Sequence, residues 1–358
     1  MSDLKALGWN EVLAEEFTSV APSGTIPGRV AVPHRGAHDV LTALGDLRCD
    51  VAGRLYDEAS SPAELPVVGD WVAVVARADE RAGTITAVLP RRTKFSRKTA
   101  WQATEEQVLA ANIDVVFIVT SLNEDLNLRR LERYLILARE SGARPVLLLT
   151  KSDLTGDIGA RVAAVEAIAV GIPIHAISSR TGEGLDDVRA YLTPGVTAAL
   201  LGSSGVGKST LANALLGEEL FATNEIRDDG RGRHTTARRE LVQLPGGGLL
   251  IDTPGMRELQ LWIADDGLEE AFEDVTSLFE HCRFSDCSHE SEPGCAVKAA
   301  LADGTLATER WESYLSLQAE LAHLERRIDN RAQSEERKRW RSVAKLSRNA
   351  ARAKGRRT

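Results

Sequence analysis

The sequence has 358 residues, enough for two or three domains that each bury a core of their own. No apolar run approaches the roughly 18 residues that a membrane helix needs, and the first residues lack the basic start and apolar core of a signal peptide. We therefore expect a soluble, cytoplasmic protein with no membrane partner.

The net charge of -8 is unevenly distributed along the chain. Residues 337–358 carry ten Lys and Arg and no Asp or Glu, so the rest of the chain is more acidic than the total suggests. We take residues 331–358 as a basic C-terminal tail. Its charge suits the phosphates of RNA, with Trp340 as a stacking residue, and the alternative is a solvated, disordered end.

The first folded region predicted from the sequence is rich in β-strands. Residues 1–27 end in Pro, Gly and Ser and predict a flexible leader. Within residues 28–98, short runs of strand-forming residues alternate with turn residues, at 29–34, 38–44, 47–55, 70–77 and 83–89. This pattern predicts an OB-fold-like β-barrel that binds RNA, or a barrel that only packs against its neighbour.

A basic cluster, "PRRTKFSRK", closes this region at residues 90–98. Five of its nine residues are Lys or Arg, and Phe95 lies among them. Phosphate contacts by the charges and stacking by the ring would suit single-stranded nucleic acid. An ordinary exposed loop is the alternative.

Residues 99–265 predict an α/β domain. Strands that are apolar throughout, such as "IDVVFIVT" and "RPVLLLT", alternate with helical patterns such as "NLRRLERYLILARESG". Strands of this kind lie in a parallel sheet that is covered on both faces. We expect a doubly wound P-loop domain whose sheet continues through "TAALLG" and "GLLIDTPG".

The strongest motif is "GSSGVGKST", which follows a predicted strand and precedes a helix. Glycines allow backbone N–H groups to surround phosphates, and the helix N-terminus adds its dipole. Lys208 would reach the β- and γ-phosphates, and the Ser209 hydroxyl would bind Mg²⁺. The predicted phosphate-binding residues are Gly202, Ser203, Ser204, Gly205, Val206, Gly207, Lys208, Ser209 and Thr210.

A second Mg²⁺ ligand is predicted at the end of a neighbouring strand. In "LLIDTPG", Asp252 ends an apolar strand, and Gly255 can offer its N–H to the γ-phosphate. Between the two motifs lies a polar loop that can supply a threonine hydroxyl to the metal. Thr235 and Thr236 compete for this role, and we assign it to Thr236.

Guanine is distinguished from adenine by a carboxylate that accepts from the ring N–H and the exocyclic amine. Asp153 of "TKSD" follows a buried strand, with Lys151 able to lie over the base. Ser178 and Ser179 follow the next strand and predict a second base contact. The base-binding set is Thr150, Lys151, Ser152, Asp153, Ser178 and Ser179. These loops precede the phosphate loop in the chain, but a site built from strand ends depends on spatial position and not on chain order.

Three of the four cysteines lie close together near the C-terminal end, so that Cys282, Cys287, His289 and Cys295 fall within fourteen residues, while Cys49 stands alone. Three thiolates and an imidazole fit a closed, structural Zn²⁺ site. Buried free cysteines are the alternative, and His281 is a competing ligand. We expect a small zinc-binding helical domain at residues 266–330, whose helix directs Trp311, Leu315 and Leu321 toward a partner surface.

Taken together, the motifs carry a specific resemblance. The order TKSD, SSRTGEG, GSSGVGKST, GRGRHTT and DTPG, with a barrel before it and a cysteine cluster after it, resembles the RsgA (YjeQ/YloQ) family of circularly permuted GTPases. The resemblance covers the chain from about residue 28 to the basic tail. It implies GTP and GDP as ligands, Mg²⁺ with GTP, one structural Zn²⁺, and binding of a monomer to the small ribosomal subunit and its rRNA late in maturation.

Two positions differ from common GTPase patterns. Thr150 stands where asparagine is usual, and a hydroxyl cannot make both contacts of an amide. Met256 stands where many GTPases have the glutamine that orients water, which predicts slow intrinsic hydrolysis and acceleration by the partner. His234 is a substitute for that glutamine or a plain loop histidine.

Three rival functions remain open from the sequence. The first is an RNA-binding scaffold with a structural nucleotide site. The second is a P-loop ATPase, and the third is a permuted GTPase that acts on the large ribosomal subunit.

Overall fold

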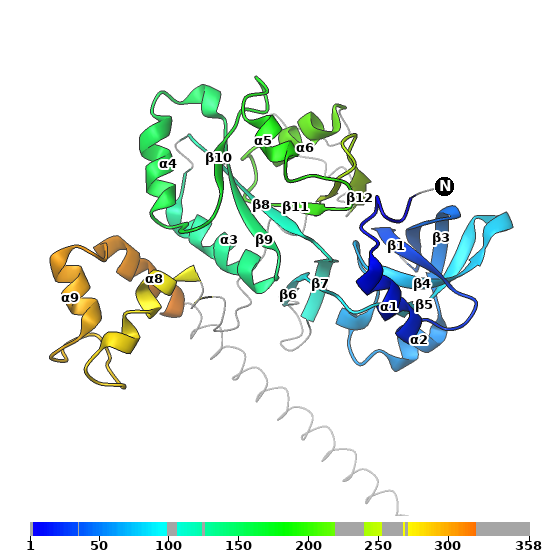
Figure 1. Cartoon of the computed structure of the whole chain (residues 1–358), viewed down its shortest axis with the longest axis horizontal. Helices are drawn as coiled ribbons and strands as arrows, with labels where there is room; N and C mark the ends of the chain where they lie inside the picture. The colour runs from blue at the N-terminus through cyan, green and yellow to red at the C-terminus, as the bar shows by residue number, and fades with distance from the viewer. Residues whose placement is uncertain are drawn as a thin grey trace, which may run out of the picture. The chain divides into compact units, whose positions relative to one another are not determined.

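The structure is a computed structural model, and it describes residues 3–34, 36–98, 106–123, 126–218, 240–252, 268 and 271–319. The chain divides into two compact units (Figure 1). The first comprises Met1–Arg97 and Gln107–Thr276, and the second comprises Lys98–Glu106 and Ser277–Thr358. Across the described ranges, no helix has the length and apolar character needed to span a bilayer.

The amino-terminal segment folds onto the barrel, which differs from the flexible leader that the sequence predicted. Helix α1 (Glu11–Val20) begins after Asn10, whose side chain accepts a hydrogen bond from the N–H of Leu13 at 3.0 Å. Leu13 is fully buried, and the ring of Trp9 meets that of Trp71 edge-on at 4.9 Å. The Pro/Gly/Ser stretch therefore only joins α1 to the barrel.

A closed barrel of five strands follows, in the order β1-β2-β3-β5-β4. Strand β1 pairs with β4 in antiparallel fashion, and β3 pairs with β5 in parallel. Alternate residues of β3 are buried and exposed, as expected for a strand with one face on a core. The bounds are β1 Ile26–Pro33, β2 His38–Thr42, β3 Gly45–Val51, β4 Trp71–Arg77 and β5 Ala82–Val88, with short helices α2 Gly53–Glu58, η1 Pro62–Glu64 and η2 Ala78–Glu80. The predicted OB-like barrel is confirmed.

Two residues of the basic cluster after the barrel, Arg91 and Phe95, are engaged within the fold. Phe95 is only 2% exposed, so the hypothesis that its ring stacks on nucleic acid is wrong. Arg91 donates through Nε and Nη2 to the two carboxylate oxygens of buried Asp70, both at 2.8 Å. The second half of the cluster forms β6 (Lys94–Lys98), which pairs with β7 (Glu106–Ala111).

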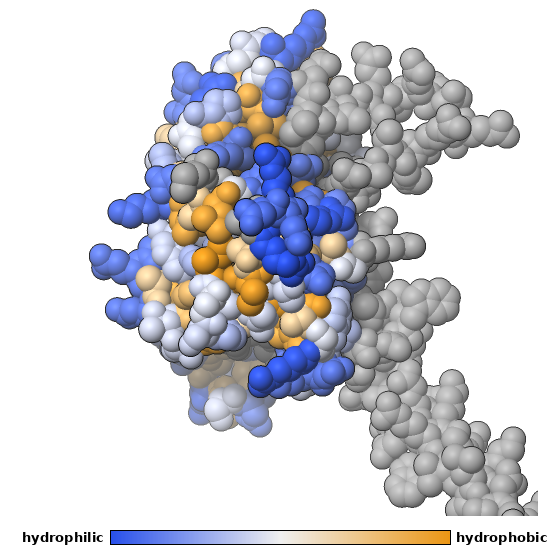
Figure 2. Space-filling model, turned by 90° about the vertical axis from the view of Figure 1, so that its right-hand side faces the viewer, coloured by the Kyte–Doolittle hydropathy of each residue, from blue (hydrophilic) through white to orange (hydrophobic). Residues whose placement is uncertain are grey.

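The outer surface of the barrel is mixed in character. Figure 2 shows the barrel side of the molecule, where hydrophobic residues gather among hydrophilic ones. The exposed large apolar residues of the barrel include Leu44, Tyr56 and Val75. Three exposed arginines are paired with carboxylates: Arg48 with Asp39, Arg54 with Glu58 and Arg77 with Glu80. Much of the arginine charge on the described barrel is therefore neutralised locally.

The first unit also contains a six-stranded sheet, with the strands in the order β10-β9-β8-β11-β13-β12. All neighbours are parallel except β12 and β13. The bounds are β8 Val115–Ser121, β9 Arg144–Thr150, β10 Ile174–Ala176, β11 Thr197–Leu201, β12 Glu240–Gln243 and β13 Leu249–Asp252. Every residue of β8 is buried, as the continuous apolar run predicted. Strands β8, β9 and β10 precede β11 in the chain and lie on one side of it in the sheet, so the loop after β9 comes before the loop after β11 in the sequence.

Helices cover both faces of this sheet. The core cluster on one face joins alternate residues of β8, such as Phe117 and Val119, to apolar residues of α5 and α6. Helix α3 packs against β8 and β9 on the other face (Figure 1). The bounds are α3 Leu128–Glu140, η3 Ser152–Leu154, α4 Ile158–Glu166, α5 Leu185–Arg189 and α6 Lys208–Leu216. A further short helix, α8 (Glu273–Thr276), ends the first unit. Because β8, β9, β10 and β11 are parallel, their carboxyl ends lie at the same edge of the sheet.

The second unit is small and helical. It contains η5 (Phe279–His281), α9 (Ala296–Asp303) and a helix over residues 308–319. The boundary between the compact units falls after Thr276, ten residues or so beyond the predicted one. Trp311 is half-buried and contacts aromatic rings of this unit, and Leu315 is 43% exposed. Leu321 and the basic tail, with Trp340, lie outside the described residues.

Candidate nucleotide site and metal centre

The phosphate-loop candidate joins β11 to α6 and is shaped by glycines. Gly202, Gly205 and Gly207 have φ angles of 154°, 81° and 98°, which residues with a side chain rarely adopt. A Cβ on Gly202 would lie 2.2 Å from the carbonyl oxygen of Val119, so a larger residue would force the loop away from the end of β8. Helix α6 begins at Lys208, and its first turn offers N–H groups that have no intrahelical acceptor.

Lys208 lies across the mouth of this loop. Its Nζ donates to the carbonyl oxygen of Gly202 at 2.7 Å and to that of Ser203, and the residue is largely buried. A phosphate cradled by the loop would meet this ammonium group. Of the other predicted phosphate-binding residues, Val206 is fully buried, and the remainder lie in the loop and the first turn of α6: Ser204, Ser209 and Thr210.

Two side chains tie the loop after β9 to the phosphate loop. Thr150 Oγ1 lies 2.6 Å from the carbonyl oxygen of Val206 and 3.2 Å from that of Thr120. Lys151, in a left-handed conformation with φ 61°, donates through Nζ to the carbonyl oxygen of Gly205 at 2.9 Å. An asparagine at this position would brace the phosphate loop and contact the purine. In this structure Thr150 braces the phosphate loop.

Asp153 is positioned by the loop that follows β10. Ser178 Oγ donates to Asp153 Oδ1 at 2.7 Å, and Ser178 is fully buried. The hydroxyl that the sequence assigned to base contact is thus bonded to Asp153, which leaves the second carboxylate oxygen of this exposed residue for a ligand. The hydroxyl oxygens of Ser152 and Ser179 are buried without a partner among the described residues. An orphaned hydroxyl at this position suits a ligand contact.

The metal side of the nucleotide site is described only in part. Asp252 ends β13, which pairs directly with β11, so its backbone lies at the same sheet edge as the phosphate loop. Gly255, Thr235, Thr236, His234 and Met256 lie outside the described residues. Ser209 is therefore the one predicted Mg²⁺ ligand whose side chain the structure places.

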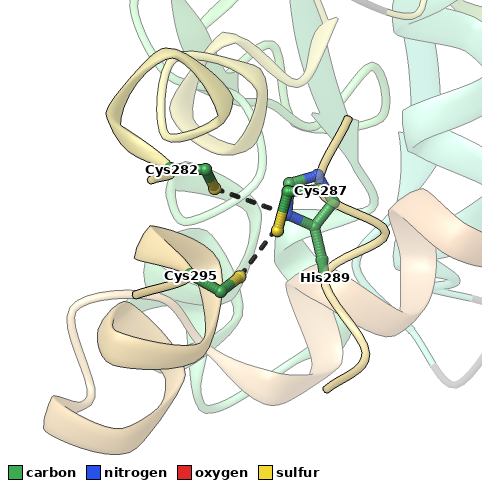
Figure 3. A group of neighbouring side chains, drawn as sticks. All are labelled: Cys282, Cys287, His289 and Cys295. Atoms are coloured by element: carbon green, nitrogen blue, oxygen red, sulfur yellow. Dashed lines mark hydrogen bonds between the residues drawn. The ribbon is translucent and has the colours of Figure 1, made fainter. Parts of the chain in front are cut away.

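The cysteine cluster is brought together in the second unit. The ligand atoms of Cys282, Cys287, His289 and Cys295 all lie within 4.8 Å of one another. Figure 3 shows the sulfur atoms gathered at one side of the imidazole, whose Nδ1 lies 3.6 Å from Cys282 Sγ and 3.5 Å from Cys295 Sγ. His281 is not part of this group. The donor set of three sulfurs and one nitrogen, held this closely, fits a tetrahedral Zn²⁺ ion.

Two of the four side chains in the cluster have pKa shifts that favour their metal-binding forms, whereas burial raises the pKa of the Cys287 thiol to about 11. Burial acts to raise the pKa of the Cys282 thiol, but the backbone N–H groups of Ala296 and Val297, at the start of α9, outweigh it and the pKa is lowered. Burial lowers the pKa of His289, which keeps its imidazole neutral at pH 7. A thiolate and a neutral imidazole are the forms that bind a metal.

The sequence resembles that of a characterised GTPase family over its whole length. Residues 88–262 match the family described as RsgA GTPase. The protein named small ribosomal subunit biogenesis GTPase RsgA in Opitutus terrae is 47% identical over 363 residues, covering 99% of each chain. The protein of the same name in Streptomyces coelicolor is 46% identical over 357 residues, covering 99% of this chain and 96% of the relative.

Solved structures show the same fold. YjeQ from Thermotoga maritima superposes with a TM-score of 0.64 at 28% identity, covering 83% of this chain and 99% of the other. YloQ, described as a circularly permuted GTPase, superposes with a TM-score of 0.62 at 23% identity, covering 84% of this chain and 96% of the other. The second likeness speaks for the fold alone.

Proposed function

This chain belongs to the RsgA GTPase family, and we propose on that premise that it hydrolyses GTP to GDP and phosphate during biogenesis of the small ribosomal subunit. The observation that carries the proposal is the joining of three loops at one sheet edge. The loop after β9 is bonded to the phosphate loop through Thr150 and Lys151, and to the loop after β10 through Asp153. These contacts support one continuous guanine-nucleotide site.

The proposed chemistry relies on positioning and charge. Backbone N–H groups of the phosphate loop and the ammonium of Lys208 would bind the phosphates and stabilise the charge that develops as the γ-phosphoryl group leaves. Mg²⁺, when bound, supplies charge neutralisation at the phosphate oxygens. We assign it to Ser209, with Asp252 and Thr236 as further ligands predicted from the sequence.

The choice of guanine is assigned to Asp153. Asp153→Asn is expected to weaken GTP binding roughly 10- to 100-fold, because a charged acceptor is lost, and to favour xanthine nucleotides relative to GTP. Competition against a fluorescent guanine nucleotide measures both effects. Asp187→Asn, at an exposed position of α5, is the matched control and should bind GTP normally. Full GTP affinity in Asp153→Asn would show that this residue does not read the base.

We also propose one structural Zn²⁺ at Cys282, Cys287, His289 and Cys295, and binding of the monomer to small-subunit rRNA. The close approach of the four donor atoms supports the metal. The relatives' names and the basic composition of residues 337–358 support the partner. Because the described barrel arginines are largely paired, we assign the main electrostatic contribution to the tail.

The function is tested by multiple-turnover phosphate release from the full chain alone, with purified small subunits and with large subunits. We expect slow release alone, acceleration by small subunits only, and loss of both rates in Lys208→Ala. Equal rates with and without small subunits would contradict stimulation by the partner. Acceleration by large subunits, equal use of ATP, or no Lys208-dependent turnover would each favour one of the rival functions.

A further inference from the structure

Aromatic rings surround the imidazole of His289 in the second unit. The ring of Phe279 stacks on His289 with centroids 4.4 Å apart and planes 23° apart. Trp311 meets the imidazole edge-on at 5.8 Å, and Trp311 in turn stacks on Tyr314 at 5.6 Å. Phe279 also contacts Tyr314 edge-on at 5.7 Å. We call these three side chains, Phe279, Trp311 and Tyr314, the aromatic clamp.

Within the described part of the chain, the imidazole of His289 is held in its orientation by aromatic rings and not by a hydrogen bond to its second nitrogen. Nδ1 of His289 faces the sulfur atoms (Figure 3). The backbone of His289 adopts a left-handed conformation with φ 61°. A metal-binding histidine ordinarily has its second ring nitrogen held by a carboxylate or carbonyl group. Among the described residues, Nε2 of His289 has no such acceptor. The aromatic rings are therefore the groups in contact with the imidazole that can hold its plane.

The clamp connects the predicted metal ligands to a separate helix. Phe279 belongs to η5, three residues before Cys282, whereas Trp311 and Tyr314 belong to the helix over residues 308–319. Arg310, Ser313, Tyr314 and Leu317 of that helix are buried, while Leu315 is exposed. One face of the helix thus packs inward, and beside it Trp311 contacts His289 while Tyr314 contacts Phe279.

We propose that Phe279 and Trp311 are positioning residues of the metal site, and that the metal, through the same contacts, holds the helix over residues 308–319 in its docked position. This inference rests on the zinc site proposed above. The two effects are one coupling free energy, because a contact that favours metal binding must be favoured by the metal to the same extent. Without the metal, the aromatic rings alone restrain the imidazole, and the packing of Trp311 against it is weakened.

The first test measures zinc release from the full chain. Zinc-loaded protein is mixed with a chromogenic chelator, and the release rate is followed by absorbance. Trp311→Ala and Phe279→Ala are expected to release zinc 10- to 100-fold faster, the range typical of groups that orient a metal-binding histidine. Trp311→Phe, which keeps a ring, should lie close to wild type. Leu315→Ala, on the exposed side of the same helix, and Phe284→Ala, exposed and outside the clamp, should match wild type.

The second test follows the helix itself by hydrogen exchange. Peptides covering residues 308–319 are compared in zinc-loaded and chelated wild-type protein, with α3 in the first unit as internal reference. Zinc removal is expected to increase exchange at least tenfold in residues 308–319 and to leave α3 unchanged. In Trp311→Ala the zinc-loaded protein should already exchange faster in this helix, so the increase on chelation should shrink.

The outcomes separate the coupling from the metal site. Failure to bind one equivalent of zinc would overturn the metal assignment and the coupling with it. Normal zinc binding, with wild-type release rates in both alanine variants, would overturn the coupling alone. Unchanged exchange of residues 308–319 after verified zinc removal would do the same. If Phe279→Ala does not fold, the comparison of Trp311→Ala with Trp311→Phe decides the question.

Discussion

At the scale of single residues, Thr150 shows how a departure from a motif can be accommodated. The hydroxyl has one proton, and it lies closer to the carbonyl oxygen of Val206 than to that of Thr120. The residue is buried, so loss of this donor would leave a desolvated acceptor in the phosphate loop. The most important contact of the Thr150 hydroxyl is therefore the one with the Val206 carbonyl oxygen of the protein itself.

We predict that Thr150→Val weakens GTP binding about tenfold, which corresponds to one lost hydrogen bond in a buried setting. Thr150→Ser, which keeps the donor, should bind within about twofold of wild type, and Thr150→Asn should bind equally or better. Titration with a fluorescent GTP analogue measures all three. Thr155→Val is the control, because the described residues give its hydroxyl no hydrogen bond. Equal affinity of the valine and serine variants would contradict the bracing role.

His38 gives the barrel a pH-dependent contribution to stability. Burial lowers its pKa below the ordinary value, and its Nε2 donates to the carbonyl oxygen of Pro66 at 3.3 Å. Since the unfolded chain binds a proton more readily than the folded one, this residue's contribution is present above about pH 6.5 and is lost as the pH falls.

We predict that wild type loses more unfolding free energy between pH 7.5 and 5.5 than His38→Gln does. Urea denaturation of both chains at both pH values measures the difference. Protonation of the zinc ligands affects both chains alike and cancels in this comparison. An identical pH dependence in the two chains would show that His38 titrates normally in the fold.

At the scale of elements, the sequence predicted the regular strands and helices but not the tertiary role of short segments. The five barrel strands and the buried strands of the sheet followed from alternation and continuous apolar runs. Residues 3–25 and Phe95 did not, because their burial depends on neighbours distant in the chain, such as Trp71. Likewise, spacing brought Asp153 and Ser178 to one loop cluster but could not show which hydroxyl bonds to which carboxylate.

Helix α1 is expected to contribute substantially to the stability of the first unit. Leu13→Ala should lower the unfolding free energy by about 2–5 kcal/mol, as for other buried leucines. Val12→Ala, one residue earlier and 58% exposed, should change it by less than about 0.5 kcal/mol. Urea denaturation measures both. Equal stability of the two variants would indicate that the segment is a loose leader after all.

At the scale of the whole molecule, Arg29 joins parts of the first unit that are far apart in the chain. Its guanidinium is 1% exposed and donates to the carbonyl oxygens of Leu7, Gly69 and Asn112. These come from the amino-terminal segment, the barrel and the residue just before the sheet. Burial lowers the pKa of Arg29 to about 10, which still leaves it charged at pH 7.

We predict that Arg29→Met destabilises the first unit by on the order of 3 kcal/mol, because the carbonyl groups of Leu7 and Asn112 lose this donor and that of Gly69 keeps only Asn112 Nδ2. The barrel and the nucleotide domain should also begin to unfold separately, seen as nucleotide release that no longer coincides with the loss of barrel protection in hydrogen exchange. Arg48→Met is the control, since its ion pair with Asp39 is exposed and worth about 1 kcal/mol or less. Coincident unfolding in Arg29→Met would argue against this residue as the link.

The strand order has a mechanical consequence. Among the described strands, β13 is the last of the sheet in chain order, so the chain after Asp252 leads on to the second unit. If the chain began at β11, strands of the same sheet would anchor both ends of that segment. Here the segment follows a strand of the sheet at one end, and at the other the chain runs through α8 and enters the second unit after Thr276. The segment expected to sense the γ-phosphate thus also lies on the covalent path from the nucleotide site to the second unit.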